Sequence, residues 1–132
     1  MESTGKCYRI IVNPDTEEIR IKGEFKLPGL SESMNLEGLT LIESNGVLKV
    51  FYGDRGSDSR PSTLFFADYN VKQNDITVVR SYSFSLLESM SDKRNIADLV
   101  FDKKGNLWSA ATSDPGNDGP FETRLFRVGK MS

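Results

Sequence analysis

Short segments in which apolar and polar residues alternate follow one another along the whole chain. The segment 19–25 (IRIKGEF) is of this kind, whereas 36–42 (LEGLTLI) is mostly apolar. Alternation with a period of two is typical of a half-buried β-strand, and a short apolar run suits a strand buried on both faces. The pattern predicts strands at 6–12, 19–25, 36–42, 47–52, 63–69, 76–84, 96–101, 107–112 and 124–128.

Turn-forming residues separate these segments. Asn13-Pro14-Asp15 ends the first segment, and Asn45-Gly46 lies between the third and the fourth. Asparagine followed by glycine accepts the positive φ angles that a tight hairpin turn requires. The segment 86–94 has no amphipathic face, so we interpret it as a loop with little helix. The sequence therefore predicts an all-β fold of consecutive antiparallel strands.

The chain also resembles itself at an offset of 60 residues without a gap. The matched pairs are Asn35 and Asn95, Leu39 and Leu99, Asp54 and Asp114, Gly56 and Gly116, Asp58 and Asp118, Thr63 and Thr123, and Phe66 and Phe126. A four-stranded antiparallel repeat of about 40–60 residues is typical of β-propeller blades. We predict one propeller-like domain (1–132) with an outer hairpin (6–27), a full blade (35–84) and a three-stranded blade (95–129). The alternative is a β-sandwich whose halves are alike only in composition.

Composition excludes several classes of function. The net charge is −2, and lysine and arginine are scattered, so no basic stripe is available for nucleic acid. No apolar run approaches the roughly 20 residues that span a bilayer, and the first residues do not resemble a signal peptide. We therefore expect a soluble, cytoplasmic protein that binds neither nucleic acid nor membrane. The single cysteine, Cys7, is expected to be a small buried apolar residue.

The chain contains no histidine, which limits its chemistry. Serine and cysteine nucleophiles activated by histidine are excluded, as is zinc bound through imidazole. Any metal site must be built from oxygen ligands, and such sites suit calcium or magnesium.

Blade geometry would gather the loops 53–62, 86–94 and 113–122 at one end of the molecule. Two of these loops contain Asp-x-Gly-x-Asp, which predicts a calcium site, although aspartate and asparagine are also common turn residues. The candidate metal ligands are Asp54, Asp58, Asp114, Asn117 and Asp118. The candidate ligand-binding residues on the same acidic face are Glu37, Arg55, Arg60 and Asp98.

Arginine at two positions of the first loop suggests a small anionic ligand. Arg55 and Arg60 flank Asp58, and guanidinium groups hold phosphate or carboxylate through paired hydrogen bonds. The alternative interpretation is an arginine–aspartate pair that holds the loop in place. Glu37 and Asp98 are predicted to begin the innermost strands, near the same end of the molecule. Glu37, at the start of an apolar strand, is expected to be partly desolvated and to need a partner or a metal.

Two stretches resemble blades of the bacterial phytase-like propellers that are described as esterase-like. They are NLEGLTLIESNGVLKVFYGDRGSDSRPSTLFFADYN (35–70) and DLVFDKKGNLWSAATSDPGNDGPFETRLF (98–126). Most of the resemblance comes from Glu-Gly-Leu at 37–39 and from Asp-Pro-Gly-x-Asp-Gly-Pro-Phe at 114–121. The resemblance implies a propeller fold and a calcium-dependent hydrolase. The family closes a ring with more blades than this chain holds.

Two functions therefore compete. The first is a β-propeller-type module that binds a ligand or partner through its acidic loop face. The second is a calcium-dependent phosphoester or ester hydrolase of the phytase-like type, in which bound calcium activates water or holds substrate oxygens. The sequence alone leaves open whether the chain is an enzyme. Because the first and last units are incomplete, we also expect the propeller to be completed by homo-oligomerisation.

Overall fold

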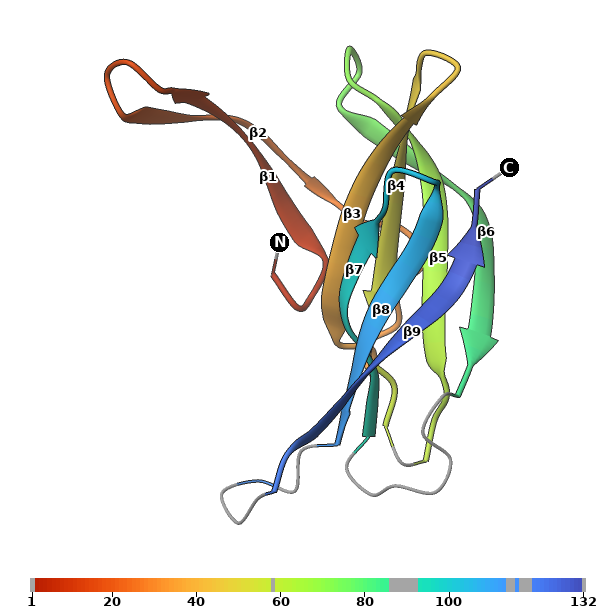
Figure 1. The fold of residues 1–132 in the computed structure, drawn as a ribbon. Coiled ribbons are helices and arrows are strands. Elements are labelled where there is room, and N and C mark those ends of the chain that lie inside the picture. The colour runs from red at the N-terminus through yellow and green to blue at the C-terminus, as the bar shows by residue number, and fades with distance from the viewer. Residues whose placement is uncertain (1, 58, 86–92, 114–115, 117–119, 132) are drawn as a thin grey trace.

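The computed structural model describes residues 2–57, 59–85, 93–113, 116 and 120–131, and these form three antiparallel β-sheets (Figure 1). The hairpin sheet pairs β1 (Lys6–Asn13) with β2 (Glu18–Lys26). The central sheet has the order β3 (Leu36–Ser44), β4 (Val47–Asp54), β5 (Ser62–Asn70) and β6 (Asp75–Phe84). The C-terminal sheet has the order β7 (Lys93–Phe101), β8 (Asn106–Ser113) and β9 (Glu122–Lys130).

The predicted all-β fold is confirmed, and each of the nine predicted strands lies within an observed one. The sheets contain two, four and three strands, in chain order. Asn45 and Gly46 both have positive φ, as the hairpin turn between β3 and β4 requires. No helix within the described ranges is long and apolar enough to cross a membrane.

The central sheet is covered on both faces, because its side chains alternate between two hydrophobic cores. Tyr52 and Phe65 point into the core shared with the hairpin sheet, where Cys7 is buried as predicted. Phe51 points into the core shared with the C-terminal sheet, beside Ile96. The three sheets therefore form a stack with the central sheet in the middle.

The C-terminal sheet approaches the central sheet most closely where β7 lies against β3 and β4. Ile96 is fully buried there and lies over two glycines. A Cβ atom placed on Gly53 would come within 2.6 Å of the Ile96 side chain, and one on Gly38 within 2.9 Å. Real Cβ atoms do not approach so closely. Glycine is therefore required at both positions for this distance between the sheets.

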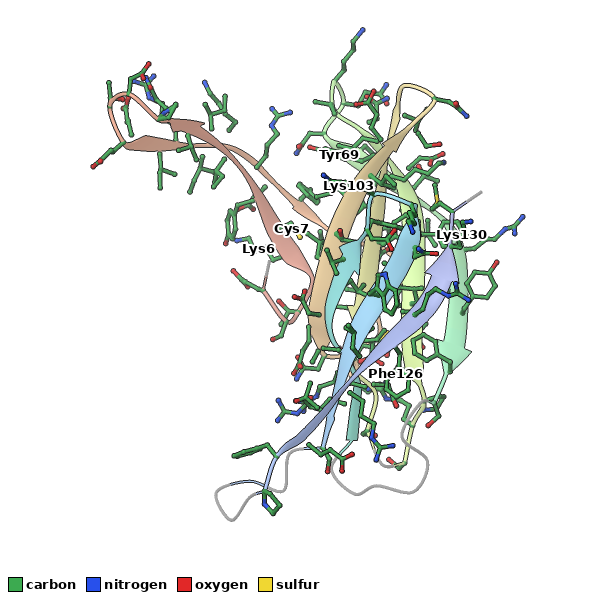
Figure 2. The ribbon with its side chains drawn as sticks, in the orientation of Figure 1. Lys6, Cys7, Tyr69, Lys103, Phe126 and Lys130 are labelled. Atoms are coloured by element: carbon green, nitrogen blue, oxygen red, sulfur yellow. The ribbon has the colours of Figure 1, made fainter. Side chains whose placement is uncertain are left out.

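Only the base of the hairpin sheet packs against the central sheet. The rings of Phe25 and Tyr69 are 5.4 Å apart, and the Arg9 guanidinium donates a 3.0 Å hydrogen bond to the carbonyl of Val71. The Asn74 amide donates to the carbonyl of Glu24 at 3.2 Å. Beyond these contacts the far end of the hairpin stands away from the other sheets (Figure 2).

The register of the sheets corrects the alignment of the repeat. Tyr52 pairs with Phe65 across β4 and β5. An offset of 60 in both strands would pair Thr112 with Leu125 across β8 and β9, but Thr112 pairs with Thr123 and Ala111 with Arg124. The observed pairs fit an equal offset of 59 in the two strands. The strand order of the repeat is therefore as predicted, but the gapless offset of 60 is wrong by one residue in these strands.

A difference of one residue matters because successive side chains in a strand point to opposite faces. The offset of 60 would equate Leu48 with Trp108, whereas an offset of 59 equates Leu48 with Leu107. Leu107 is buried against the central sheet, and Leu48 packs in the core on the hairpin side. The two larger sheets thus use equivalent faces to contact the sheet that precedes each of them in the stack.

Candidate functional site

A polar pocket of about 600 Å³ lies at the end of the central sheet where β4 leads into β5. Its walls come from residues 3–4, the segment before β3 and the loop after β4. Arg55 and Arg60 line it, together with the hydroxyl-bearing residues Ser33, Ser57 and Ser59 and the carboxylate of Glu32. The structure therefore brings both predicted arginines to one pocket.

Arg60 is held by a buried carboxylate. The side chain of Asp54 is fully buried, and the Arg60 guanidinium donates hydrogen bonds to both of its oxygens. The backbone N–H of Asn35 donates a further bond of 2.8 Å to Asp54. The Asp54 carboxylate raises the pKa of Arg60. This pair holds the loop, as the alternative interpretation proposed, and its carboxylate is that of Asp54.

The Arg55 side chain is held by Glu37, a carboxylate that was predicted as a ligand-binding residue. Its guanidinium donates a 3.1 Å hydrogen bond to the carboxylate of Glu37, which is partly buried. The guanidinium of Arg94, at the start of β7, lies 3.6 Å from the same carboxylate oxygen. Glu37 therefore joins the loop after β4 to the C-terminal sheet, and it has the partner that a desolvated carboxylate needs.

The backbone around Arg55 is fixed as firmly as its side chain. Its N–H donates to the carbonyl of Asn35 at 2.9 Å, and its carbonyl accepts from the N–H of Asn95 at 3.0 Å and from the Ser62 hydroxyl at 2.7 Å. Gly56 follows with φ of 74°, and a Cβ there would lie 2.8 Å from the Ser62 nitrogen. The loop thus reaches the pocket in one defined shape.

The predicted metal site is only partly within the described residues. Asp58, Asp114, Asn117 and Asp118 lie outside them, so their arrangement is not described. Asp54 is described, and both of its oxygens already bind donors from the protein. Among the residues that the structure describes, no group of three or more acidic or cysteine side chains could hold a metal ion. The described geometry gives Asp54 the role of an anchor for Arg60.

The predicted position of Asp98 at the start of its strand is wrong, because β7 begins earlier than the sequence suggested. The strand starts at Lys93, so Asp98 lies in its middle, opposite Ala110. Asp98 is exposed, whereas its neighbour Leu99 is buried against the central sheet. Asp98 therefore faces the outside of the stack. The strand was predicted from the apolar run at 96–101, so the preceding polar residues, which also belong to the strand, were missed.

Asp102, in the turn between β7 and β8, is a further carboxylate that supports the structure. It accepts hydrogen bonds from the Trp108 indole at 3.0 Å, from the Asn106 amide at 2.7 Å and from the backbone of Lys104 at 2.8 Å. These hydrogen bonds, chiefly those from Asn106 and Trp108, lower the pKa of Asp102 well below its usual range.

We expect the Asp102–Trp108 contact to persist in acid. A lowered pKa in the folded state contributes stability above the unfolded pKa of about 3.9, and this is lost as the pH falls through the folded value. The fluorescence of Trp108, the single tryptophan, should stay constant down through pH 4 and change only below it. Circular dichroism on the same samples would separate a local change from unfolding. A local fluorescence transition centred near pH 4 would contradict this prediction.

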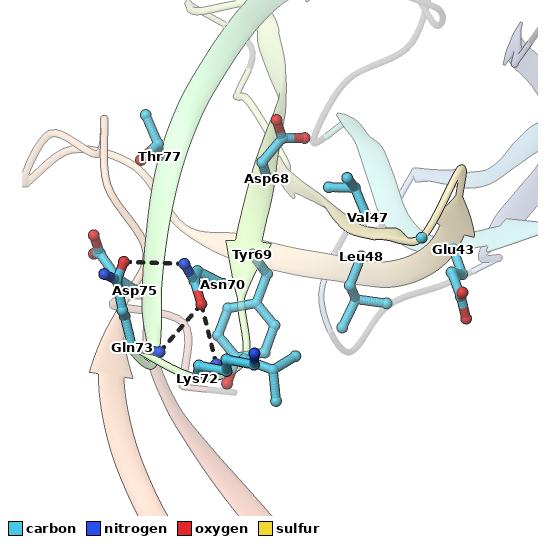
Figure 3. Close-up of a pocket in the computed structure, with 12 residues that line it drawn as sticks. Glu43, Val47, Leu48, Asp68, Tyr69, Asn70, Lys72, Gln73, Asp75 and Thr77 are labelled. Atoms are coloured by element: carbon cyan, nitrogen blue, oxygen red, sulfur yellow. Dashed lines mark hydrogen bonds between the residues drawn. The ribbon is translucent and has the colours of Figure 1, made fainter.

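A larger pocket of about 750 Å³ lies at the opposite end of the central sheet, between the β3–β4 and β5–β6 turns (Figure 3). Its polar groups mainly support the turns. Asn70 accepts hydrogen bonds from the backbone of Lys72 and Gln73, each 3.1 Å long, and Lys49 pairs with Asp68 at 2.7 Å. Its lining includes carboxylates but no arginine. The pocket beside Arg55 therefore remains the candidate site.

Comparison with known proteins finds no matching family model, no matching curated protein and no matching solved structure.

Proposed function

We propose that the chain is a β-propeller-type module that binds a small oxyanion, a phosphate or a carboxylate, in the pocket beside Arg55 and Arg60. The observation that carries the proposal is that both arginines line one pocket and that each is already held by a carboxylate. A guanidinium has several N–H donors in a fixed plane and can bind an oxyanion while it keeps its carboxylate partner.

Preorganisation supports this function. A flexible surface arginine loses side-chain entropy when it binds a ligand, and an arginine that is already fixed loses less. Arg55 and Arg60 are each about one-third exposed in the structure, so part of each side chain remains accessible from the pocket. The serine hydroxyls of the lining can donate to the oxygens that the arginines leave unbound.

The charges of this end also favour an anion over a cation. The sequence predicted an acidic face, but Glu37 and Asp54 are each paired with an arginine. Arg94, at the start of β7, is a third positive group, and it lies beside Glu37. Glu37 and Asp54 are thereby neutralised, and Glu32 adds one further carboxylate to the described pocket lining. The binding groups that favour an anion are the hydrogen-bond donors of Arg55 and Arg60.

The propeller part of the proposal rests on how the sheets stack. Consecutive antiparallel sheets contact one another face to face, and their strands follow the chain outward from β3 and from β7. The buried side chains support this, because Leu48 of the central sheet packs on the hairpin side and Leu107 of the C-terminal sheet packs on the central-sheet side, which are equivalent faces at an offset of 59. Repeated packing of this kind is what successive propeller blades require.

Titration with inorganic phosphate tests the proposal. We expect saturable binding by calorimetry, and we expect Arg55→Gln to weaken it about tenfold or more, because a charged hydrogen bond contributes about 1.5–3 kcal/mol. Glu37 keeps Arg94 beside it in this variant, so the fold should survive. Arg20→Gln is the matched control, since Arg20 also pairs with a glutamate but lies on the hairpin. Equal affinities of both variants and the parent chain would overturn the proposal.

The same samples separate this function from the alternative, a calcium-dependent hydrolase. That enzyme would turn over p-nitrophenyl phosphate or a p-nitrophenyl ester, and a chelator would abolish the turnover. Phosphate binding that needs no calcium, without turnover, supports the binding module. Turnover that depends on calcium would replace the proposal with the hydrolase.

A further inference from the structure

The hairpin sheet carries an apolar face that no described part of the chain covers. Cys7 points toward the central sheet, so Tyr8, Ile10 and Val12, which alternate with it along β1, point away. A register shift after Arg9 pairs Ile21 with Ile10 and Ile19 with Val12, so these two residues of β2 lie on the same outer face. This outer hairpin face consists of Tyr8, Ile10, Val12, Ile19 and Ile21, each between 39% and 67% exposed. The pairs Ile10–Ile21 and Val12–Ile19 stand directly opposite each other. The face is therefore continuous across both strands.

The C-terminal sheet carries a second such face at the other end of the stack. Leu107, Ser109 and Ala111 are buried against the central sheet, and the residues between them point outward. Among the described residues, the apolar members of this outer C-terminal face are Val100, Trp108, Ala110 and Leu125. Val100 is 54% exposed and Leu125 is 67% exposed, which is high for residues of this kind in a strand.

We propose that the outer hairpin face of one copy of this chain packs against the outer C-terminal face of a second copy. This inference does not depend on the proposed function. The partner is a second copy, because the packing between sheets within one copy shows which kind of sheet face packs against each outer face. Within the chain, the central sheet accepts the hairpin sheet on one face and the C-terminal sheet on the other.

The repeat makes the outer hairpin face and the outer C-terminal face a matching pair, because each is equivalent to a face that packs against another sheet. The C-terminal sheet packs on the central sheet through the face equivalent to the one that the central sheet turns toward the hairpin. The outer C-terminal face is therefore equivalent to the face of the central sheet that packs against the next sheet along the chain. The outer hairpin face points in the opposite direction along the stack. Contact between the two would repeat, between copies, the packing that already joins the sheets within one copy.

Charge at the two faces permits this contact. Lys6 and Glu24 form a 3.1 Å ion pair at the base of the outer hairpin face. Asp98 and Arg127 lie on the outer C-terminal face, and the whole chain has a net charge of only −2. Each face thus offers both signs beside an apolar centre, and the weak net charge does not oppose association.

Because the two faces differ, the contact is heterologous, and it must close into a ring or continue as a filament. We expect a ring, so light scattering at micromolar concentration should give a whole multiple of the 14.8 kDa chain mass. The melting temperature should rise with protein concentration, since assembly stabilises the folded chain. A monomer at these concentrations would overturn the proposal.

Two charge substitutions identify the faces. Ile21→Glu and Leu125→Glu alter side chains that are 67% exposed, so neither should unfold the chain, and each alone should give monomers. A mixture of the two variants retains one intact face on each and should form a one-to-one dimer. Val71→Glu is the matched control, because Val71 is 50% exposed at a turn outside both faces, and it should leave the assembly unchanged.

Other outcomes would exclude the pairing. If Ile21→Glu dissociates the assembly and Leu125→Glu does not, the contact is hairpin to hairpin. If the mixture of the two variants stays monomeric, the two faces do not meet. Arg55→Gln should still assemble, because Arg55 lies in neither face, so failure of the phosphate-binding proposal would leave this one intact.

Discussion

Replacing Arg60 by alanine should lower the free energy of unfolding by about 3 kcal/mol or more. The substitution would remove the guanidinium that binds both oxygens of Asp54 and leave a fully buried carboxylate with the N–H of Asn35. A buried charge without its counter-ion is far more costly than the loss of an exposed pair. Urea unfolding, followed by circular dichroism, measures the difference.

A matched substitution and a double mutant distinguish the cause. Arg20→Ala removes an exposed arginine that also binds a carboxylate with two nitrogen atoms, and it should change stability by less than about 1 kcal/mol. The double variant Asp54→Asn with Arg60→Ala removes the charge from both partners and should be more stable than Arg60→Ala alone. If Arg60→Ala and Arg20→Ala cost the same, the buried pair does not stabilise the loop.

The sequence pattern was sufficient to predict the strands, but it predicted only part of the arrangement of the loop after β4. It placed Arg55 and Arg60 together and recognised that an arginine–aspartate pair could hold the loop. It assigned Asp58 as the partner, because Asp58 stands between the two arginines in the sequence. In the folded chain β4 extends to Asp54, which is buried at the strand end and reaches Arg60 across the turn. Such a pairing depends on strand length, which local pattern predicts poorly.

The role of Arg94 was missed for a related reason. The apolar pattern of the seventh strand begins at residue 96, and polar residues before it were assigned to a loop. In the structure β7 starts at Lys93, and a register irregularity between Arg94 and Asp98 lets the strand continue. Arg94 consequently lies beside Glu37, and Asp98 points outward. The earlier start of β7 thus adds Arg94 to the candidate site and takes Asp98 away from it.

The alignment of the repeat failed in a more general way. Identities at the loops favoured an offset of 60 residues, because aspartate and glycine recur in both turns for their turn chemistry. The strands fit an offset of 59, which follows from the strand pairing together with the buried faces and not from single identities. Because side chains alternate, the difference exchanges the buried and exposed faces of β8 and β9. The assignment of the outer C-terminal face therefore requires the structure.

The close contact between the central and C-terminal sheets leads to the second large effect. Ile96→Ala should lower the free energy of unfolding by about 2–5 kcal/mol, because Ile96 is fully buried. Gly53→Ala should cost about 1–3 kcal/mol, because its methyl group would collide with the Ile96 side chain at 2.6 Å. If the two residues press on each other, the costs will not add.

In the double variant Gly53→Ala with Ile96→Ala, the new methyl group occupies space that the shortened side chain leaves. We expect it to be more stable than the sum of the single effects predicts, by about 0.5–3 kcal/mol, in the range of coupling between residues in contact. Gly129→Ala is the control, because no atom lies within 4 Å of its added Cβ, and it should be near neutral in both the parent and the Ile96→Ala background. Additive costs for Gly53→Ala and Ile96→Ala would mean that β7 does not lie against β3 and β4 as described. The described packing of the three sheets, on which the two outer faces and the pocket depend, would then be wrong.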